Sequence, residues 1–302
     1  MKRIIIKFTM ACMAMMYMTT PSALAQSMET DSVETDSVVR VIGWFNKTDT
    51  LEYSITLVEA YIENGDTTVT EANTSEFRIT VADSTKNGYV MRYVPTGTWR
   101  NDSTSAQGQF LLIASRSAIG SEVLFSTDEY GVFKEITNWK EVYKRATTFQ
   151  KDYIDKIYYE HPELYARQPK QEFVKKVRET TDELIGTKEK MTEQFLALKL
   201  LFAFHGKELK IGETAFDQNG LHYYYDITQG KLEEDDESTD DEYQIYSELE
   251  AVEEEESHPH YYYTYNYFPD GWPREVMSTI VDPLEGKTRL TQIRIEWISK
   301  AW

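Results

Sequence analysis

The chain has 302 residues, and its 51 acidic residues outnumber its 32 lysines and arginines, so that the formal net charge at pH 7 is −19. A protein of this charge is repelled by the phosphates of nucleic acids and by anionic lipid head groups. Neither is therefore an expected partner. The length allows one large domain or two smaller lobes.

Residues 1–25 have the layout of a secretory signal peptide. A positive start is followed by a largely apolar run over residues 4–17, and the small residues Ala23 and Ala25 occupy the positions that decide cleavage. Cleavage is expected after Ala25 and leaves no transmembrane segment. A short membrane anchor is the alternative, but Lys7 interrupts the apolar run.

Cleavage removes the only cysteine, Cys12, and three basic residues, which takes the net charge to −22. The mature chain then has no disulfide and no cysteine-ligated metal. Lipidation of Cys12 is an alternative, although the usual leucine is missing from the three residues before it. An exported protein without disulfides is typical of a bacterial envelope, so we expect the protein in the periplasm or at the cell surface.

Residues 26–38 contain a tandem repeat, because the five residues that begin at Glu29 recur from Glu34. The segment is polar and acidic and is predicted to be a flexible leader. It also contains triplets such as Asp31-Ser32-Val33, which resemble acceptor sites of an envelope O-glycosylation system. Residues 39–302 are predicted to form a single β-rich α+β domain.

Residues 39–136 are predicted to form an antiparallel β-meander. Apolar and polar residues alternate over 51–57, which is typical of a strand with one buried face. Asn64-Gly65 offers a hairpin turn, and the apolar run 110–113 is interpreted as a further strand. Strands joined by such short turns pair antiparallel, because parallel pairing needs long crossovers.

The period changes to that of a helix over residues 138–206, which are predicted to form a block of three helices. Asn138 and Glu141 have the spacing of a capping box at the start of the first helix. The second helix runs from about 169 to 185, and Thr187 caps the third. This block has 13 basic and 11 acidic residues, so the negative charge belongs to the rest of the chain.

The third helix contains a long apolar stretch, Phe195–Phe204, which is interrupted only by Lys199. A helix that is hydrophobic on all sides is normally buried, and ten residues are too few to cross a bilayer. We therefore expect this helix to be an apolar plug against the sheet. Lys199 is expected to reach a polar edge or an acidic partner.

The strand period returns over residues 207–302, which are predicted to form a second β-meander. This meander contains an acidic loop, 231–256, with a strand near 243–246 in its middle, and it closes with a strand over 291–298. The predicted fold class is therefore α+β. Antiparallel β-meanders, in one curved sheet or in two sheets, flank and pack on a central three-helix block.

An aspartate-rich segment is the first candidate metal site. The carboxylates of Asp235, Asp236, Asp240 and Asp241 are hard oxygen ligands that could hold Ca²⁺. The segment has no glycine to make the sharp turn of a calcium loop, and a run of like charges is more often a solvated loop. Apart from this calcium alternative, no cofactor is expected.

His258 and His260 are the second candidate, because they follow four glutamates at 253–256. Two imidazoles with carboxylates could hold zinc or copper. Pro259, however, disturbs the strand geometry that would place both imidazoles on one face. The other three histidines are isolated in the sequence, which favours structural roles.

Aromatic residues gather at 223–225 and 261–267, with Trp272 shortly after. Aromatic faces can stack on sugars or line an apolar pocket, but they are also ordinary strand residues, and the core and sheet surface are the favoured interpretation. The sequence has no nucleophile elbow, glycine-rich phosphate loop or His-Glu-x-x-His helix. This pattern favours a protein that is not an enzyme.

We therefore expect an exported envelope protein that acts as a non-catalytic binding or scaffold protein for an apolar small molecule or a protein partner. The order of signal, β-meander, helices and β-meander is loosely similar to that of half-barrel envelope proteins that hold lipid under helices. Two alternatives stay open. One is a glycan hydrolase that uses a carboxylate pair, and the other is an assembly component that pairs through its sheet edges.

Overall fold

The computed structural model describes residues 38–101, 106–218, 221–229, 243–251 and 258–301. The expected signal peptide and the leader up to residue 37 lie outside the described residues. The last residue assigned to the leader, Val38, is instead the first residue of a strand.

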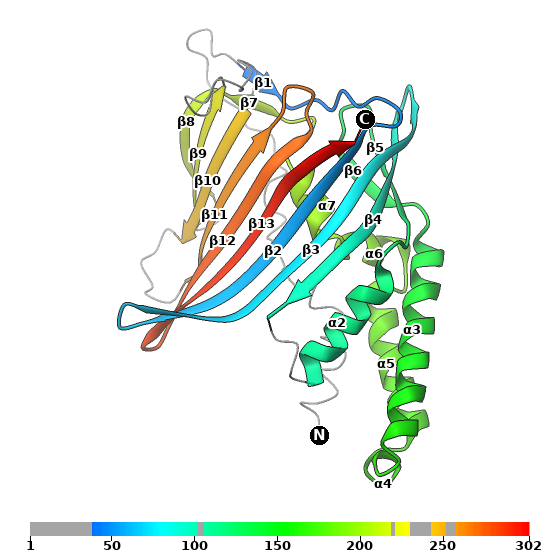
Figure 1. Cartoon of the computed structure of the whole chain (residues 1–302). Helices are drawn as coiled ribbons and strands as arrows, with labels where there is room; N and C mark the ends of the chain where they lie inside the picture. The colour runs from blue at the N-terminus through cyan, green and yellow to red at the C-terminus, as the bar shows by residue number, and fades with distance from the viewer. Residues whose placement is uncertain (1–37, 102–105, 219–220, 230–242, 252–257, 302) are drawn as a thin grey trace.

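A single antiparallel sheet of eleven strands dominates the molecule (Figure 1). Its order from edge to edge is β6-β5-β4-β3-β2-β13-β12-β11-β10-β9-β8. The first half of the chain supplies β2 (Thr50–Glu63), β3 (Asp66–Thr85), β4 (Gly88–Arg100), β5 (Val123–Thr127) and β6 (Phe133–Ile136). The second half supplies β8 (Gly212–Gln218), β9 (Leu221–Gln229), β10 (Tyr243–Ala251), β11 (His260–Tyr267), β12 (Pro273–Leu284) and β13 (Lys287–Ala301).

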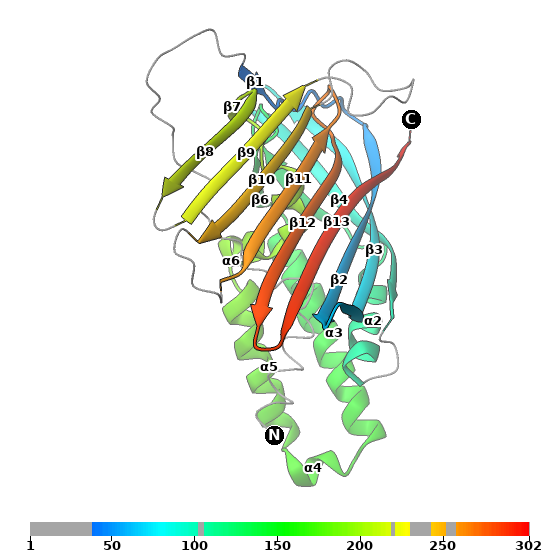
Figure 2. The same ribbon diagram turned by 90° about the vertical axis from the view of Figure 1, so that its left-hand side faces the viewer.

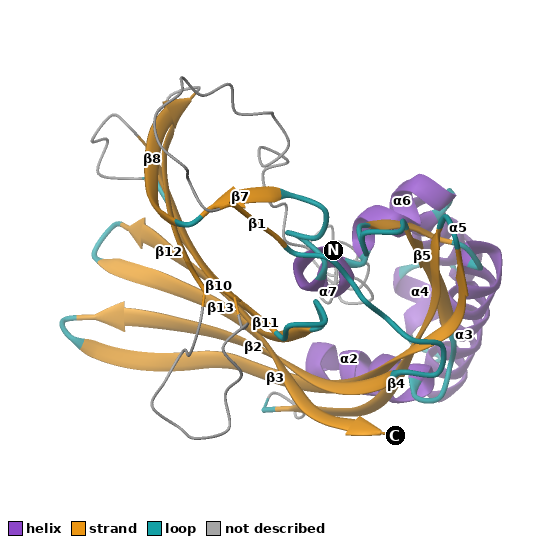
Figure 3. Ribbon diagram, turned by 90° about the horizontal axis from the view of Figure 1, so that it is seen from above, coloured by secondary structure: helices purple, strands orange, loops and turns teal. Residues whose placement is uncertain are grey.

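The two predicted meanders are joined into this one sheet. The join is the pairing of β2 with β13, in which Ile55 lies opposite Ile295. A smaller two-stranded sheet pairs β1 (Val38–Arg40) with β7 (Glu208–Lys210). The predicted α+β arrangement, with meanders flanking a central three-helix block, is therefore wrong: most of the described residues are in strands, the sheet is continuous, and it curves around α7 (Leu196–Leu201; Figure 3).

Alternation along the strands gives the sheet two unlike faces. Residues such as Tyr53, Phe77 and Ile295 point to the concave side and are fully buried. The convex side carries ion pairs between neighbouring strands, including one in which Arg294 Nε lies 2.7 Å from Glu275 Oε1. An antiparallel sheet with one covered and one solvated face shows this pattern.

The β2–β3 hairpin turns at Asn64 and Gly65, as predicted. Both residues have positive φ, 52° and 87°, which a two-residue hairpin turn requires and which Asn-Gly adopts readily. The hairpin leads into a strand of 20 residues, β3. Because β2, β3, β12 and β13 are long, this part of the sheet extends well beyond its neighbours (Figure 1).

The segment predicted as a strand over 110–113 is part of a helix, α2 (Ala106–Ala118), so that prediction is wrong. A short apolar run does not by itself distinguish a strand from a buried helix. Here the run lies among alanines and other residues that tolerate a helix, and α2 packs against β4.

The block between the two halves of the sheet contains five helices, not three. They are α3 (Trp139–Glu160), α4 (Leu164–Arg167), α5 (Lys170–Ile185), α6 (Lys188–Gln194) and α7 (Leu196–Leu201). The predicted third helix is broken at Phe195, whose ψ of 65° is not helical. Figure 2 shows α3 and α5 as a hairpin that projects away from the sheet, with its own small core around Ile154 and Val177.

The predicted capping box at Asn138 is also wrong. Its side chain makes no cap hydrogen bond. Instead, Asn138 Oδ1 accepts a hydrogen bond from the backbone N–H of Leu124 at 2.8 Å, which ties the start of α3 to β5. The cap at Thr187 is confirmed, because its hydroxyl accepts from the N–H of Lys190.

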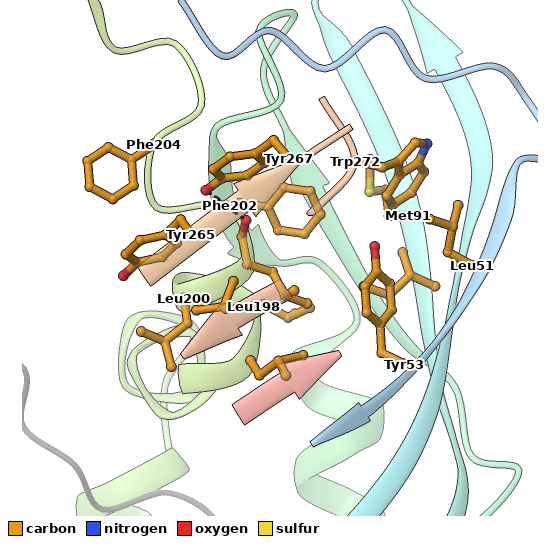
Figure 4. Packing of buried hydrophobic residues seen from close by; sticks show 14 of the residues in the cluster. Leu51, Tyr53, Met91, Leu198, Leu200, Phe202, Phe204, Tyr265, Tyr267 and Trp272 are labelled. Atoms are coloured by element: carbon orange, nitrogen blue, oxygen red, sulfur yellow. Dashed lines mark hydrogen bonds between the residues drawn. The ribbon is translucent and has the colours of Figure 1, made fainter. Parts of the chain in front are cut away.

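The apolar stretch that includes α7 is buried against the concave face, as predicted. Leu198 and Leu201 are fully buried, and Phe204 contacts Tyr265 of β11 edge to face, with ring centroids 4.7 Å apart (Figure 4). Lys199 points outward, and its Nζ lies 2.5 Å from Glu193 Oε2. This packing fixes α7 inside the curve of the sheet. Among the described residues, no helix is long and apolar enough to cross a membrane.

Candidate functional site

The concave face is organised in rows that run across the strands. Directly paired residues of antiparallel strands point to the same side of a sheet, so the strand registers define each row. The first row is Tyr225, Ser247, Tyr263, Ser278, Ile293, Leu57, Asn73 and Arg100. The second is Tyr223, Leu249, Tyr261, Ile280, Thr291, Glu59 and Glu71.

Aromatic side chains form one end of both rows, over β8 to β11. Phe216 of β8 stacks on Tyr223 with ring centroids 5.0 Å apart, and Tyr263 stacks on Tyr265 of the same strand. Burial raises the pKa of Tyr225 and of Tyr263 to about 12. These tyrosines are therefore neutral, and they present flat apolar faces to the concave side.

The residues predicted as an aromatic concentration divide between the two faces of the sheet. Tyr224 and Tyr262 point to the convex side, because their neighbours on each strand point inward. Trp272 is fully buried in the core. The interpretation as core and sheet surface is consistent with these positions.

Aliphatic side chains form the middle of both rows. Ile293 and Leu57 are paired in the first row, and Ile280 lies in the second. Ile55 and Leu57 are partly buried and pack against the main core. We call Leu57, Ile280 and Ile293, together with Ile55 in the adjacent row, the aliphatic strip.

Polar residues form the other end, on β3 and β4. Arg100 Nη2 lies 2.6 Å from Glu71 Oε1, and Asn73 Nδ2 donates to the same oxygen at 2.5 Å. The Arg100 side chain is only 4% exposed. We call Glu71, Asn73 and Arg100 the polar cluster.

Negative charge is in excess around the polar cluster. Glu71 neutralises Arg100 at contact distance, and such pairing is what allows a guanidinium to be buried. Glu59 is paired with Glu71 across β2 and β3, so its carboxylate is on the same side. Two carboxylates therefore accompany one guanidinium at this end of the concave face.

Only the second of the two predicted metal sites lies within the described residues. Asp235, Asp236, Asp240 and Asp241 lie outside the described residues. His258 is exposed, and His260 Nδ1 lies 3.3 Å from Glu250 Oε2 at the start of β11. Among the described residues, no group of three or more histidine, cysteine, aspartate or glutamate side chains is arranged to hold a metal ion.

The polar cluster was missed in the sequence, although a signal for it exists. Phe77 and Ile79 establish which positions of β3 point inward, and counting back by twos reaches Asn73 and Glu71. Polar residues at inward positions of an otherwise apolar strand are the unusual feature. The β3–β4 pairing has a bulge between Glu76 and Phe77. Because of this bulge, the same counting by twos does not show which residue of β4 lies opposite Asn73.

Comparison with known proteins does not place the chain in a family. No family model matches the sequence, and no curated protein matches it. Among solved structures, a lipovitellin structure concerned with lipid–protein interactions matches with a TM-score of 0.41 and 11% identity, over 85% of this chain and 26% of the lipovitellin chain. The chain thus spans about a quarter of the protein it matches, and a similarity at this level supports no argument about function.

Proposed function

We propose that this protein is a non-catalytic envelope protein that binds an amphiphilic ligand along the concave face of its sheet. The proposal is supported by the order of side chains in the two rows, which pass from aromatic through aliphatic to polar on one continuous face. An elongated molecule with an apolar chain and a polar head has the same order. The export signal expected at residues 1–25 supports placing this activity in the envelope.

The dimensions of the face suit such a ligand. Neighbouring strands lie about 4.8 Å apart, so the path from β10 to β3 crosses roughly 24 Å. Apolar side chains along this path would stabilise a bound chain by about 25 cal/mol for each Å² removed from water. Among the described residues, the main helix contacts with the sheet are on β4, β5, β6 and β12.

A pair of substitutions on β2 tests the proposal. Leu57 points to the concave side and Val58, the next residue, points to the convex side. We expect Leu57→Gln to weaken binding of the neutral fluorophore N-phenyl-1-naphthylamine at least about tenfold, because loss of one buried leucine contact is worth about 1.5–3 kcal/mol. Fluorescence titration of the mature chain measures the change.

Val58→Gln is the matched control, since it adds the same side chain to the same strand on the other face. Its affinity for the fluorophore should stay within about twofold of the unmodified protein. Equal effects of both substitutions, or no binding by the unmodified protein, would show that the concave face does not bind apolar ligands. Thermal unfolding of each variant separates lost binding from lost structure.

The hydrolase alternative has one observation in its favour, the pair of Glu59 and Glu71 across β2 and β3. Two carboxylates on one face are what glycoside hydrolysis needs. However, Glu71 already accepts hydrogen bonds from Arg100 and Asn73, which restrains it as a proton donor. Release of reducing sugar from an envelope glycan, abolished by Glu59→Gln, is the result that would favour the hydrolase.

The assembly alternative concerns the two edges of the sheet, β6 and β8. Edge strands offer unpaired backbone groups to a partner strand. On β8, Glu213 and Asp217 are exposed, and charges on an edge oppose pairing with another acidic chain. Recovery of a partner that binds through β8 would favour an assembly component.

A further inference from the structure

Among the described residues, the polar cluster contains two buried atoms that have no hydrogen-bond partner. The side chain of Arg100 is 4% exposed and Asn73 is 9% exposed. Both residues donate to Glu71 Oε1, through Arg100 Nη2 and Asn73 Nδ2. Within the part of the chain that the structure describes, Arg100 Nε and Asn73 Oδ1 have no hydrogen-bond partner. Buried polar atoms in folded proteins are nearly always satisfied, so these two call for an explanation.

One of the two free atoms is a hydrogen-bond donor and the other is an acceptor. Asn73 and Arg100 are paired directly across β3 and β4, so their side chains share the concave side. The guanidinium Nε–H is a donor, and the amide oxygen is an acceptor. The donation from Asn73 Nδ2 to Glu71 fixes which amide atom is free. A group that both accepts and donates, such as a hydroxyl or a carboxamide, offers the two kinds of hydrogen bond that these atoms lack.

Charge distinguishes between head groups. The guanidinium of Arg100 is already compensated by Glu71, and Glu59 adds a second carboxylate on the same face. An anionic head group would find no uncompensated positive charge here, and Glu59 would repel it. It would also lose its hydration. An uncharged head group avoids both costs.

We infer that the ligand is an amphiphile with an uncharged head group that carries a hydroxyl or a carboxamide. The head group accepts from Arg100 Nε and donates to Asn73 Oδ1, while the apolar chain lies along the aliphatic strip toward the tyrosines of β11. This inference rests on the proposed function and specifies the class of ligand. A monoacylglycerol is a ligand of this class.

Competition between two lipids with the same chain tests the inference. The mature protein is loaded with N-phenyl-1-naphthylamine, and the probe is displaced at pH 8 by 1-monooleoylglycerol or by oleate, each below the concentration at which it aggregates. We expect 1-monooleoylglycerol to compete about tenfold better. Asn73→Leu, which removes the acceptor at similar volume, should weaken 1-monooleoylglycerol about five- to tenfold, the value of one or two neutral hydrogen bonds, and leave oleate unchanged.

Two further variants complete the design. Arg100→Lys keeps the charge beside Glu71 but removes Nε, so it should also reduce the preference for 1-monooleoylglycerol. Ser75→Ala is the matched control, because Ser75 lies on the same face and its hydroxyl already has a partner in Thr98, 3.4 Å away. It should leave the preference intact.

The outcomes separate this inference from the proposed function. If oleate competes as well as 1-monooleoylglycerol while the fluorophore still binds, the inference is overturned and the proposed function stands. A preference for oleylamine that is lost in Glu59→Gln overturns it in favour of a cationic head group. An unchanged preference in Asn73→Leu and Arg100→Lys shows that the free atoms only bind water. No binding of the fluorophore by the unmodified protein contradicts the proposed function itself.

Discussion

Leu198→Ala should lower the free energy of unfolding by about 3 kcal/mol, and Lys199→Ala should lower it by less than about 1 kcal/mol. Leu198 is fully buried in α7, and truncation of a buried leucine costs roughly 2–5 kcal/mol because a cavity replaces its contacts. Lys199 keeps a third of its side-chain surface exposed and pairs with Glu193, which is 66% exposed. Ion pairs at the surface contribute little, since solvent screens them.

Urea unfolding of the mature chain measures both changes. If the sheet and α7 form one cooperative unit, the two variants share the m-value of the unmodified protein and differ only in midpoint. Similar losses for the two neighbouring substitutions would show that α7 does not pack against the sheet as a plug. A lower m-value for Leu198→Ala alone would show that the helices unfold separately from the sheet.

Features of the fold that depend on residues close together in the sequence were predictable. Asn64-Gly65 supplies the two positive φ angles of its turn, and the hydroxyl of Thr187 reaches the N–H three residues on. The predicted strand near 243–246 is β10, and it could be predicted because apolar and polar residues alternate there within the acidic segment. Each of these depends on contacts within a few residues.

Features that depend on distant contacts were missed. Nothing in the alternation of residues 51–57 indicates that β2 pairs with β13, more than 200 residues later, so one sheet and two sheets could not be distinguished. Asn138 has the spacing of a capping residue, but the N–H of Leu124 in β5 takes its side-chain oxygen. The break at Phe195 was missed as well, and its ring contacts Tyr93 of β4, with centroids 6.2 Å apart.

The candidate site shows the same division. The aromatic segments were visible because tyrosines adjoin in the sequence, whereas Glu71, Asn73 and Arg100 come from two strands and meet only through their register. The predicted metal ligands are neighbours along the chain, which is also the case for the carboxylates of any solvated acidic loop. A polar residue at an inward-facing position of a strand is the better signal for a site on the concave face.

The second large effect concerns His205, which was predicted to be structural. Its ring is fully buried among Phe45, Phe202 and Tyr267, with centroids 5.9, 5.1 and 5.5 Å away. Its Nε2 lies 2.9 Å from the carbonyl oxygen of Gly271 and donates to it in the neutral form. Burial lowers the pKa of His205 to about 4, although backbone hydrogen bonds and the charge of Asp128 oppose the shift.

The pKa of a histidine in the unfolded chain is about 6.5, so the unfolded state binds more protons than the folded state between about pH 6.5 and pH 4. Stability is therefore present above pH 6.5 and is lost as the pH falls through this window. We expect His205 to cost about 2 kcal/mol of unfolding free energy between pH 7 and pH 5. Urea unfolding at the two pH values measures this loss.

In His205→Gln the loss between pH 7 and pH 5 should shrink by about 2 kcal/mol, because glutamine can donate to Gly271 without titrating. His161→Gln is the control, since the side chain of His161 is 58% exposed at the tip of the helical hairpin. It should retain the pH dependence of the unmodified protein. If His205→Gln retains it as well, the acid sensitivity arises from carboxylates, and the pKa of His205 is not lowered by the packing seen here.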